Sequence, residues 1–578
     1  MGPEKTQVMR KRMAYVQAIL VVCVFLLAAK SFDLQVFRAD ELAKKAENDY
    51  SRYITIKGER GQILDRNMNE LATSTDAVSV TACPKNIRNP GIAAAKLSHI
   101  LGLSRKKLER KLNSSRKFAW VAKKISPAQK DRIEKLHLAG IYFQKDSRRF
   151  YPNRSLAAQV LGFTGADGNG LEGLEFKYNS LLSGKSVKLR IKKDGKGEIL
   201  DLDKKTKLKL RGSSIVLTID KKIQFLSEQA LERAVRIHRA KSGIALVMRP
   251  STGEILSMAH FPGFNPNNFS GYKMQVFRNR AVTDAFEPGS TIKVFTAAAA
   301  LEKGFSPSYI FFCKNGNYRI GSFTIHDTHP HGWLSINQII KFSSNIGAAI
   351  ISESIGQASL YHYLKAFGFG AKTRVGCPGE TSGNLIPLKK WSKIDAGAIA
   401  FGQGISVSAI QLISAISAIA NNGILMKPML IRKIISGKGK ILRQYEPEPV
   451  RRVISEKTAK QVRYMMRLVV EKDGTGTKAD IQGYNVCGKT GTAQKALKNK
   501  KGYSNTRYTS VFAGFAPKDH PQLAIVVVVD EPENQYYGGD VAAPAFRNIL
   551  AESFNYLNIP PEKNNHTMIA SLSEGGGK

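Results

Sequence analysis

The chain has 578 residues, enough for several domains and a large buried core. It is strongly basic, with 88 lysine and arginine residues against 46 acidic ones and a formal net charge of +42. Such a charge raises the possibility of nucleic-acid binding, but no nucleic-acid motif accompanies it, and we expect no nucleic-acid partner. The five cysteines contain no Cys-x-x-Cys pair and their number is odd, so they predict neither a disulfide framework nor a zinc site.

The N-terminal region predicts a membrane anchor. An apolar stretch at 13–29 follows three cationic residues at 10–12. Because cationic residues stay on the cytoplasmic side, we expect a cytoplasmic tail over 1–12, a single transmembrane helix over 13–37, and the rest of the chain outside. A cleaved signal peptide is the alternative, but Leu27-Ala-Ala-Lys30 is a poor cleavage site.

Two modules are expected after this anchor. The first, 38–212, mixes short strand-like runs with charged helices such as 94–112. Its last part, 183–211, is basic, and the alternation of apolar and basic residues at 204–211 favours an exposed two-stranded connector.

The second module, 213–557, begins and ends with strands around a long helical middle. This order predicts an antiparallel sheet flanked by helices. The expected strands are 214–220, 243–248, 254–260, 508–516 and 523–529, and the expected helices include 224–238 and 543–557. The polar, glycine-rich tail, 558–578, is predicted to be disordered.

Three short motifs in this second module point to chemistry. They are Ser290-Thr-Ile-Lys293, Ser343-Ser-Asn345 and Lys489-Thr490-Gly491. Singly they are weak, because Ser-x-x-Lys and Ser-x-Asn each occur four times. Ser290 is distinguished by its context: Pro288-Gly289 predicts a turn and an alanine-rich helix follows, so Ser290 lies at the positive end of a helix dipole with Lys293 on the same face.

Other candidates have simpler interpretations. Ser335 also fits Ser-x-Asn, but after Gly332 it is better explained as a helix N-cap. Cys487 is expected to be a small buried hydrophobe. The histidines His326, His329 and His331 could suggest zinc, but they lie in a loop without helical spacing, and we expect no metal site. A second cluster could supply catalytic carboxylates, but we expect a structural salt-bridge network instead; it pairs Asp65 with Arg60 and Arg66, and Glu172 and Glu175 with Arg149.

Further stretches carry a family resemblance. In the second module they are Phe401–Gln411, Gly488–Ala493 and Tyr537–Phe546, and upstream they are Arg60–Asn67, Arg148–Pro152 and Gly170–Glu175. Together with the three motifs, whose link to penicillin-binding proteins and β-lactamases is a known signature, they resemble the class B penicillin-binding transpeptidases from about residue 50 to about residue 550. The resemblance implies an α+β fold: a penicillin-binding/β-lactamase-like transpeptidase domain after a membrane-proximal mixed α/β pedestal, or dimerisation, module and one transmembrane helix.

The same resemblance implies roles for single residues. Ser290 is expected to attack the carbonyl of a terminal D-alanyl-D-alanine, with Lys293 as its base. Ser343 is expected to pass the proton to the leaving group and Asn345 to hold the substrate amide. Lys489, Thr490, Gly491 and Thr492 are expected to bind the terminal carboxylate, and the backbone N–H groups of Ser290 and Thr492 to form the oxyanion hole. From the residues themselves, burial and a nearby Lys489 ammonium would both lower the pKa of Lys293.

The implied function is cross-linking of peptidoglycan stem peptides with release of D-alanine, in septal wall synthesis, by a single-pass protein of the bacterial inner membrane. β-Lactams are expected to acylate the same serine, without any cofactor. A membrane glycan polymerase and other division proteins are the expected partners. An elongation-type transpeptidase, a carboxypeptidase or β-lactamase-like hydrolase, and a non-enzymatic sensor or scaffold are the alternatives; for a hydrolase, Glu380 is the one loose candidate for activating water.

Overall fold

The computed structural model describes residues 3–192, 210–321, 323–497 and 502–562. The chain divides into two compact units, one formed by 1–58 with 184–210 and the other by 59–183 with 211–578. Each unit is described by itself below.

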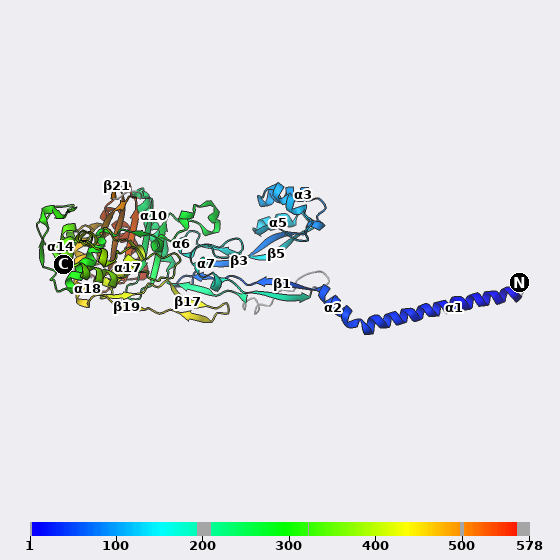
Figure 1. Cartoon of the computed structure of the whole chain (residues 1–578). Helices are drawn as coiled ribbons and strands as arrows, with labels where there is room; N and C mark the ends of the chain where they lie inside the picture. The colour runs from blue at the N-terminus through cyan, green and yellow to red at the C-terminus, as the bar shows by residue number, and fades with distance from the viewer. Residues whose placement is uncertain (1–2, 193–209, 322, 498–501, 563–578) are drawn as a thin grey trace, which may run out of the picture. The chain divides into compact units, whose positions relative to one another are not determined.

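The first unit contains the apolar N-terminal helix. Helix α1 (Pro3–Phe32) runs on through the π-turn η1 (Asp33–Phe37), and Figure 1 shows α1 as one continuous helix. An 18-residue window of the segment Gln7–Phe37 has a mean hydropathy of 2.1 and is not buried, so the segment is long and apolar enough to cross a membrane.

After helix α2 (Ala39–Tyr50) the first unit forms a two-stranded ribbon. Strand β1 (Ser51–Lys57) pairs antiparallel with β6 (Ser186–Lys192). The alternation at 204–211 predicted a two-stranded connector, and most of that segment lies outside the described residues.

The second unit begins with a small α/β lobe. Strand β3 (Glu70–Ala82) has β4 (Ala119–Ile125) on one side and β5 (Ile141–Phe150) on the other. The helices over this lobe are α3 (Pro90–Leu101), α4 (Arg105–Leu112) and α5 (Pro127–Glu134).

The prediction of a single helix over 94–112 is wrong, because the chain forms two helices, α3 and α4, in this region. Gly102 ends α3 in the left-handed conformation (φ +66°), which breaks the helix although charged residues continue on both sides.

A seven-stranded sheet joins this lobe to segments from the second half of the chain. Its order is β18–β17–β7–β2–β3–β4, with β5 also paired to β3. The added strands are β2 (Ile63–Leu64), β7 (Ser214–Leu217), β17 (Ile431–Ile435) and β18 (Ile441–Gln444). The predicted strand at 214–220 is therefore shorter than expected and belongs to this sheet. Because β2 and β7 pair in parallel, the two modules share backbone hydrogen bonds.

A buried ion-pair network stabilises the same region. The short helices here are α6 (Ala158–Leu161), α7 (Gly173–Lys177) and α8 (Asn179–Leu182). Glu175 is fully buried and pairs with Arg60 (2.5 Å) and Arg149 (2.6 Å), which confirms the predicted network for these three residues. The prediction is wrong for Asp65, whose carboxylate instead accepts backbone N–H groups, including that of Asn67 at 2.8 Å.

The second sheet is the antiparallel, helix-flanked sheet that the sequence predicts. Its order is β20–β21–β22–β8–β9. The strands are β8 (Ser242–Met248), β9 (Ile255–Phe261), β20 (Cys487–Ala496), β21 (Tyr503–Ala516) and β22 (Leu523–Asp530). Their bounds confirm the predicted hairpin and the two predicted C-terminal strands within a few residues.

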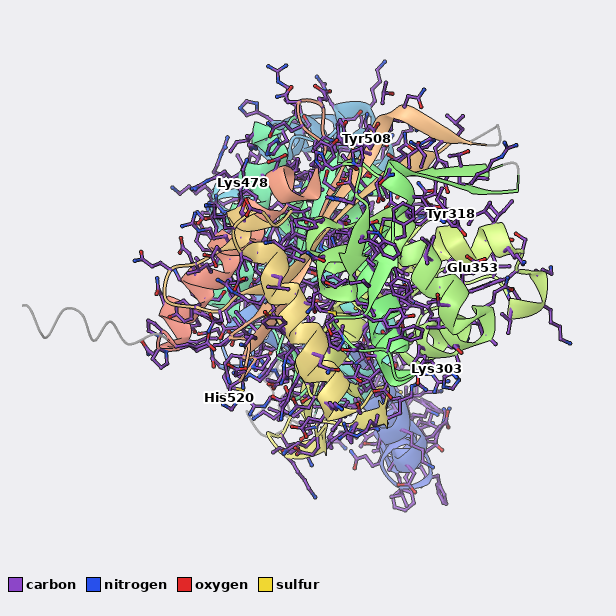
Figure 2. The ribbon with its side chains drawn as sticks, turned by 90° about the vertical axis from the view of Figure 1, so that its left-hand side faces the viewer. Lys303, Tyr318, Glu353, Lys478, Tyr508 and His520 are labelled. Carbon is purple, nitrogen blue, oxygen red and sulfur yellow. The ribbon has the colours of Figure 1, made fainter. Side chains whose placement is uncertain are left out.

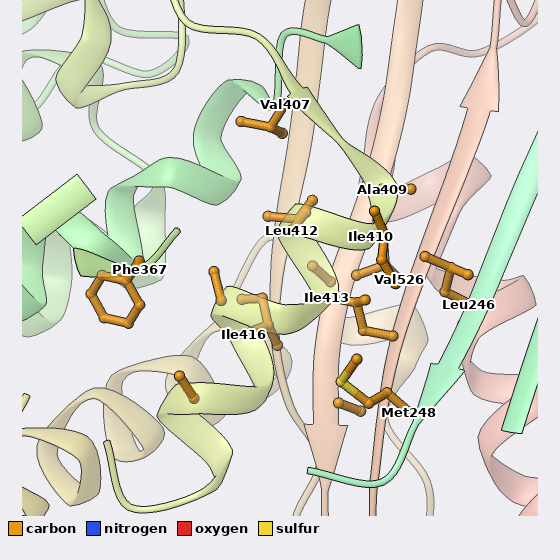
Figure 3. Packing of buried hydrophobic residues seen from close by; sticks show 14 of the residues in the cluster. Leu246, Met248, Phe367, Val407, Ala409, Ile410, Leu412, Ile413, Ile416 and Val526 are labelled. Atoms are coloured by element: carbon orange, nitrogen blue, oxygen red, sulfur yellow. The ribbon is translucent and has the colours of Figure 1, made fainter. Parts of the chain in front are cut away.

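Helices cover both faces of this sheet. Helices α10 (Lys221–Ile237), capped by Asp220, and α20 (Ala543–Leu557) pack with the strand residues of one face. Both confirm predicted helices. On the other face, α17 (Ala409–Ala420) packs against β8 and β22, with Ile410 beside Val526 (Figure 3). The strands are consequently buried on both faces, as their long apolar runs require.

The remaining helices and short ribbons complete the second unit. The helices are α11 (Arg280–Thr283), α12 (Lys293–Glu302), α13 (Ile336–Phe342), α14 (Asn345–Ile355), α15 (Gln357–Ala366), α16 (Lys393–Ala400), α18 (Glu456–Val470) and α19 (Gly538–Val541). Four short antiparallel ribbons connect them: β10 (Ala285–Phe286) with β15 (Val407–Ser408), β11 (Ile310–Phe312) with β14 (Trp333–Ser335), β12 (Asn317–Ile320) with β13 (Phe323–His326), and β16 (Ile424–Met426) with β19 (Pro449–Arg452). The β12–β13 ribbon is tied to α14, because the Tyr318 hydroxyl donates to Glu353 at 2.8 Å (Figure 2).

Candidate active site

Ser290 lies in a tight turn at the start of α12. The turn η5 (Gly289–Ile292) leads directly into that helix, as the sequence predicts. The Gly289 N–H donates to the Gly402 carbonyl (3.2 Å), and a Cβ built on Gly402 would come within 2.0 Å of the Gly289 oxygen. The two glycines therefore let the backbones approach closely enough to fix the turn that presents Ser290.

Lys293 is fully buried in the first turn of α12. Its ammonium nitrogen donates to the Ser343 carbonyl and to Asn345 Oδ1 (2.7 Å), and lies 3.3 Å from Ser343 Oγ. These contacts join the first two motifs. The Ser290 hydroxyl has no hydrogen-bond partner in the described part of the chain, so it is available to a substrate.

Lys489 brings in the third motif. It is fully buried on β20, and its Nζ donates to Ser343 Oγ at 2.9 Å. Ser343 itself sits at the C-cap of α13 with φ +61°. Its hydroxyl is thus held between the Nζ atoms of Lys293 and Lys489, a geometry suited to moving a proton.

Burial lowers the pKa values of both lysines. For Lys293, desolvation lowers the pKa to about 7, against the opposing attraction of the Asp327 carboxylate. For Lys489, desolvation and then the charge of Lys293 lower the pKa well below its usual range. The two ammonium groups repel each other, and this repulsion contributes to the lowered pKa of Lys489. A neutral amine beside Ser290 is therefore accessible near neutral pH.

The rest of the Lys-Thr-Gly strand lies against the Ser290 turn. A Cβ on Gly491 would come within 2.6 Å of the Pro288 oxygen, and one on Gly289 within 3.2 Å of the Thr492 nitrogen. The backbones of Ser290 and Thr492 are therefore neighbours, as an oxyanion hole requires. The hydroxyl of Thr490 lies 2.8 Å from that of Thr475, and Thr492 Oγ1 accepts the Gly538 N–H at 3.0 Å.

No sequence motif predicts a role for Asp327, which orients the Ser343-Ser-Asn345 motif. Asp327 accepts the backbone N–H groups of Asn345 and Ile346 and, at 2.5 Å, the Ser344 hydroxyl. The neighbouring His326 carbonyl accepts from the Asn345 side chain at 2.9 Å. Asp327 lies in the histidine-rich loop at 326–331, which matches no catalytic motif, and the packing of the β12–β13 ribbon against α14 brings it to the Ser343 motif.

Comparison with known proteins agrees with this geometry. Residues 243–551 match the penicillin binding protein transpeptidase domain, and residues 55–217 match the penicillin-binding protein dimerisation domain. The chain belongs to the class B penicillin-binding proteins.

Relatives of this penicillin-binding protein match along nearly its whole length. Peptidoglycan D,D-transpeptidase FtsI of Escherichia coli K12 is 33% identical over 552 residues, 94% of this chain and 91% of FtsI. Stage V sporulation protein D of Bacillus subtilis is 36% identical over 566 residues, 96% of this chain and 87% of that protein. The structure of penicillin-binding protein 3 from Mycobacterium tuberculosis in complex with aztreonam has a TM-score of 0.70 and 29% identity, and covers 88% of this chain and 98% of the other.

Other polar candidates in this penicillin-binding protein have structural partners. Ser335 caps α13 through a reciprocal pair with Gln338, which confirms the N-cap interpretation. His326 Nδ1 lies 2.7 Å from Asn317, and Glu380 accepts the Thr373 N–H and hydroxyl, both at 2.6 Å. Cys487 is fully buried, as predicted, and burial raises the pKa of its thiol.

Within residues 3–192, 210–321, 323–497 and 502–562, no group of three or more His, Cys, Asp or Glu side chains is arranged to hold a metal ion.

Proposed function

We propose that this chain cross-links peptidoglycan as a serine-type D,D-transpeptidase, with Ser290 as the nucleophile. The observation that carries the proposal is the position of Ser343 Oγ between the two buried lysines, Lys293 and Lys489, with Lys293 directly after the turn that holds Ser290. Relatives named peptidoglycan D,D-transpeptidases support the same activity.

The geometry supports the following acylation step. Neutral Lys293 takes the proton of Ser290 Oγ as that oxygen attacks the carbonyl carbon of the penultimate D-alanine. The oxyanion forms against the N–H groups of Ser290 and Thr492, where losing one donor typically costs about 10²–10³ in rate. Ser343 passes a proton from the lysine pair to the amine of the departing D-alanine.

Deacylation completes the cross-link. An amine of a second stem peptide attacks the carbonyl carbon of the Ser290 ester and gives a proton to Lys293. Lys293 then passes that proton to Ser290 Oγ as the ester bond breaks and the new amide bond remains. Thr490, Gly491, Thr492 and Lys489 form the wall where a terminal carboxylate binds, and Asn345 faces the substrate amide. A β-lactam would place its ring carbonyl and carboxylate in the same positions, so the same serine is acylated.

We further propose the cellular setting. The run of cations at 10–12 before the apolar helix supports a cytoplasmic N-terminus and a second unit outside the bacterial inner membrane. Similarity to FtsI supports a septal role, with a membrane glycan polymerase and other division proteins as partners.

Labelling with a fluorescent penicillin tests the acyl-enzyme. The full-length protein in detergent should form a stable adduct that Ser290→Ala abolishes and Ser335→Ala leaves intact. Rapid loss of the label with turnover of the lactam would indicate a hydrolase, and absence of any label would overturn the proposal.

Cell depletion tests the division role. Filamentous cells on depletion would support septal synthesis, whereas rounded cells would indicate an elongation-type enzyme.

A further inference from the structure

A row of rings extends from the surface ribbon β11–β14 to the residue before Ser343. The rings of Phe312 and Trp333 lie 5.1 Å apart, and His331 stacks on Phe342, also at 5.1 Å. Two ammonium groups lie over this row, Lys314 above Phe312 at 5.4 Å and Lys341 above Phe342 at 5.6 Å. We call these six residues the aromatic rim.

The aromatic rim is built on regular backbone. Trp333 is directly opposite Phe312 in the β11–β14 pairing, and the Cys313 N–H donates to the Gly332 carbonyl at 2.6 Å. Trp333 nevertheless leaves 66% of its surface exposed. A rigidly held tryptophan that contributes so little to the core is typical of a binding surface.

The aromatic rim also lies within reach of the reactive serine. Trp333 stands two residues before Ser335, the residue that caps the start of the seven-residue helix α13. Ser343 lies at the other end of this helix, about 10 Å away, where it contacts Lys293. An extended peptide advances about 3.4 Å per residue, so a stem peptide of about four residues spans roughly 14 Å. A stem peptide whose carboxyl end is at Ser290 can therefore have its sugar-linked end over the aromatic rim.

The chemistry of the aromatic rim suits a sugar. A pyranose ring has an apolar C–H face that packs flat on an aromatic ring, while its hydroxyl and acetamido oxygens accept hydrogen bonds at the ring edge. Trp333 and Phe312 supply such faces, and Lys314 and Lys341 supply donors beside them.

We propose that the aromatic rim binds the glycan strand to which the stem peptide is attached, and so selects polymeric over free peptide substrate. This inference rests on the proposed transpeptidase function, since that function brings a glycan-linked peptide to Ser290.

The test compares the full-length parent protein with the variants Trp333→Ala and Trp333→Phe. The matched control is Tyr464→Ala, which removes a half-exposed aromatic side chain on α18. Each protein is given fluorescent penicillin, a short acyl donor without sugar, and glycan-linked stem peptides. Trp333→Ala should react with the first two as the parent does but cross-link glycan-linked peptide about tenfold more slowly, the amount expected for losing one aromatic face. Trp333→Phe should recover most of the loss, and Tyr464→Ala should show none.

Binding is measured separately with peptide-free glycan strands, read by tryptophan fluorescence. The chain has three tryptophans, and the change seen in the parent should vanish in Trp333→Phe. Because Trp333→Ala lacks the reporting ring, its binding is compared with that of the parent by the amount of glycan strand retained on the immobilised protein. Equal retention by parent and Trp333→Ala would overturn the proposal, and so would an equal loss of activity toward all three substrates. If only co-purification with a membrane protein is lost, the aromatic rim is a protein-docking surface and the proposal is wrong. A parent that penicillin does not label would instead refute the transpeptidase function, while the glycan-binding measurement would still decide the role of the rim.

Discussion

At the scale of single residues, the buried lysines determine the pH dependence of acylation. The pKa of Lys293 is lowered to about 7, and only the neutral amine accepts a proton. The rate constant for acylation by penicillin should therefore rise as pH increases through about 7 and level off above it. Stopped-flow measurement with a fluorescent penicillin over a range that brackets neutrality checks this, and a rate that falls over the same range would contradict the role of Lys293 as base.

Asp327→Asn should move this profile in a definite direction. The Asp327 carboxylate favours the charged form of Lys293, so its removal lowers the pKa of Lys293 and shifts the rising limb to lower pH. The plateau should fall by about tenfold, because Ser344 and Asn345 lose a charged acceptor. Asp131→Asn, an exposed change in the small lobe, is the control; a limb that stays in place or moves to higher pH would show that Asp327 acts only through structure.

The reactive residues themselves could be predicted from the sequence, and their support could not. Ser290, Lys293 and Lys489 belong to short motifs that can be recognised in the sequence by their order along the chain. For Ser290, the preceding Pro-Gly turn is a further sequence feature. Asp327 has no such signature, because its partners Ser344 and Asn345 meet it only through the packing of a ribbon against a helix.

At the scale of elements, the contact between Gly289 and Gly402 offers a matched pair of substitutions. Both Gly402 (φ +93°) and Gly404 (φ +74°) are in the left-handed region, so alanine at either costs about 1 kcal/mol in backbone strain. In Gly402→Ala the new methyl group would also clash with the Gly289 backbone. A Cβ on Gly404 would have no neighbouring atom nearer than 3.8 Å. Penicillin acylation should fall at least about a hundredfold in Gly402→Ala, as for a misplaced nucleophile, and little in Gly404→Ala. Similar rates for the two variants would contradict a role for this contact in positioning Ser290.

Element boundaries followed from local signals where those signals were unambiguous. Helix α20 ends where predicted, and α10 begins directly after Asp220, the last residue of the predicted strand at 214–220, which caps the helix. The error at 94–112 has a physical cause: basic and apolar residues continue through Gly102 at helical spacing, and only the left-handed conformation of that glycine separates the two helices. The pairing of β2 with β7 could not be predicted, since it depends on segments from two modules.

At the scale of the whole molecule, the shared sheet should make the two modules of the second unit unfold together. Glu175→Gln leaves Arg60 and Arg149 buried without a counter-charge, which should lower the free energy of unfolding by about 3 kcal/mol. Thermal unfolding followed by circular dichroism and by loss of penicillin labelling should show both signals falling at the same, lower temperature.

Glu172→Gln is the control for that measurement. Glu172 forms no ion pair among the described residues, and burial raises the pKa of its carboxyl, so its effect should stay within about 0.5 kcal/mol. A lower unfolding temperature for circular dichroism alone in Glu175→Gln, with labelling unchanged, would mean that the modules unfold independently.

The shared sheet also sets the order in which the molecule can be assembled. Strand β2, near residue 63, hydrogen-bonds to β7, and β7 in turn to β17, beyond residue 430. During synthesis, the edge N–H and C=O groups of the early strands stay unpaired until most of the polypeptide has been made. Contacts between segments so distant in sequence also form slowly. Nascent chains of this protein should therefore depend on chaperones that cover the exposed strand edges until β17 has been synthesised and can pair with β7.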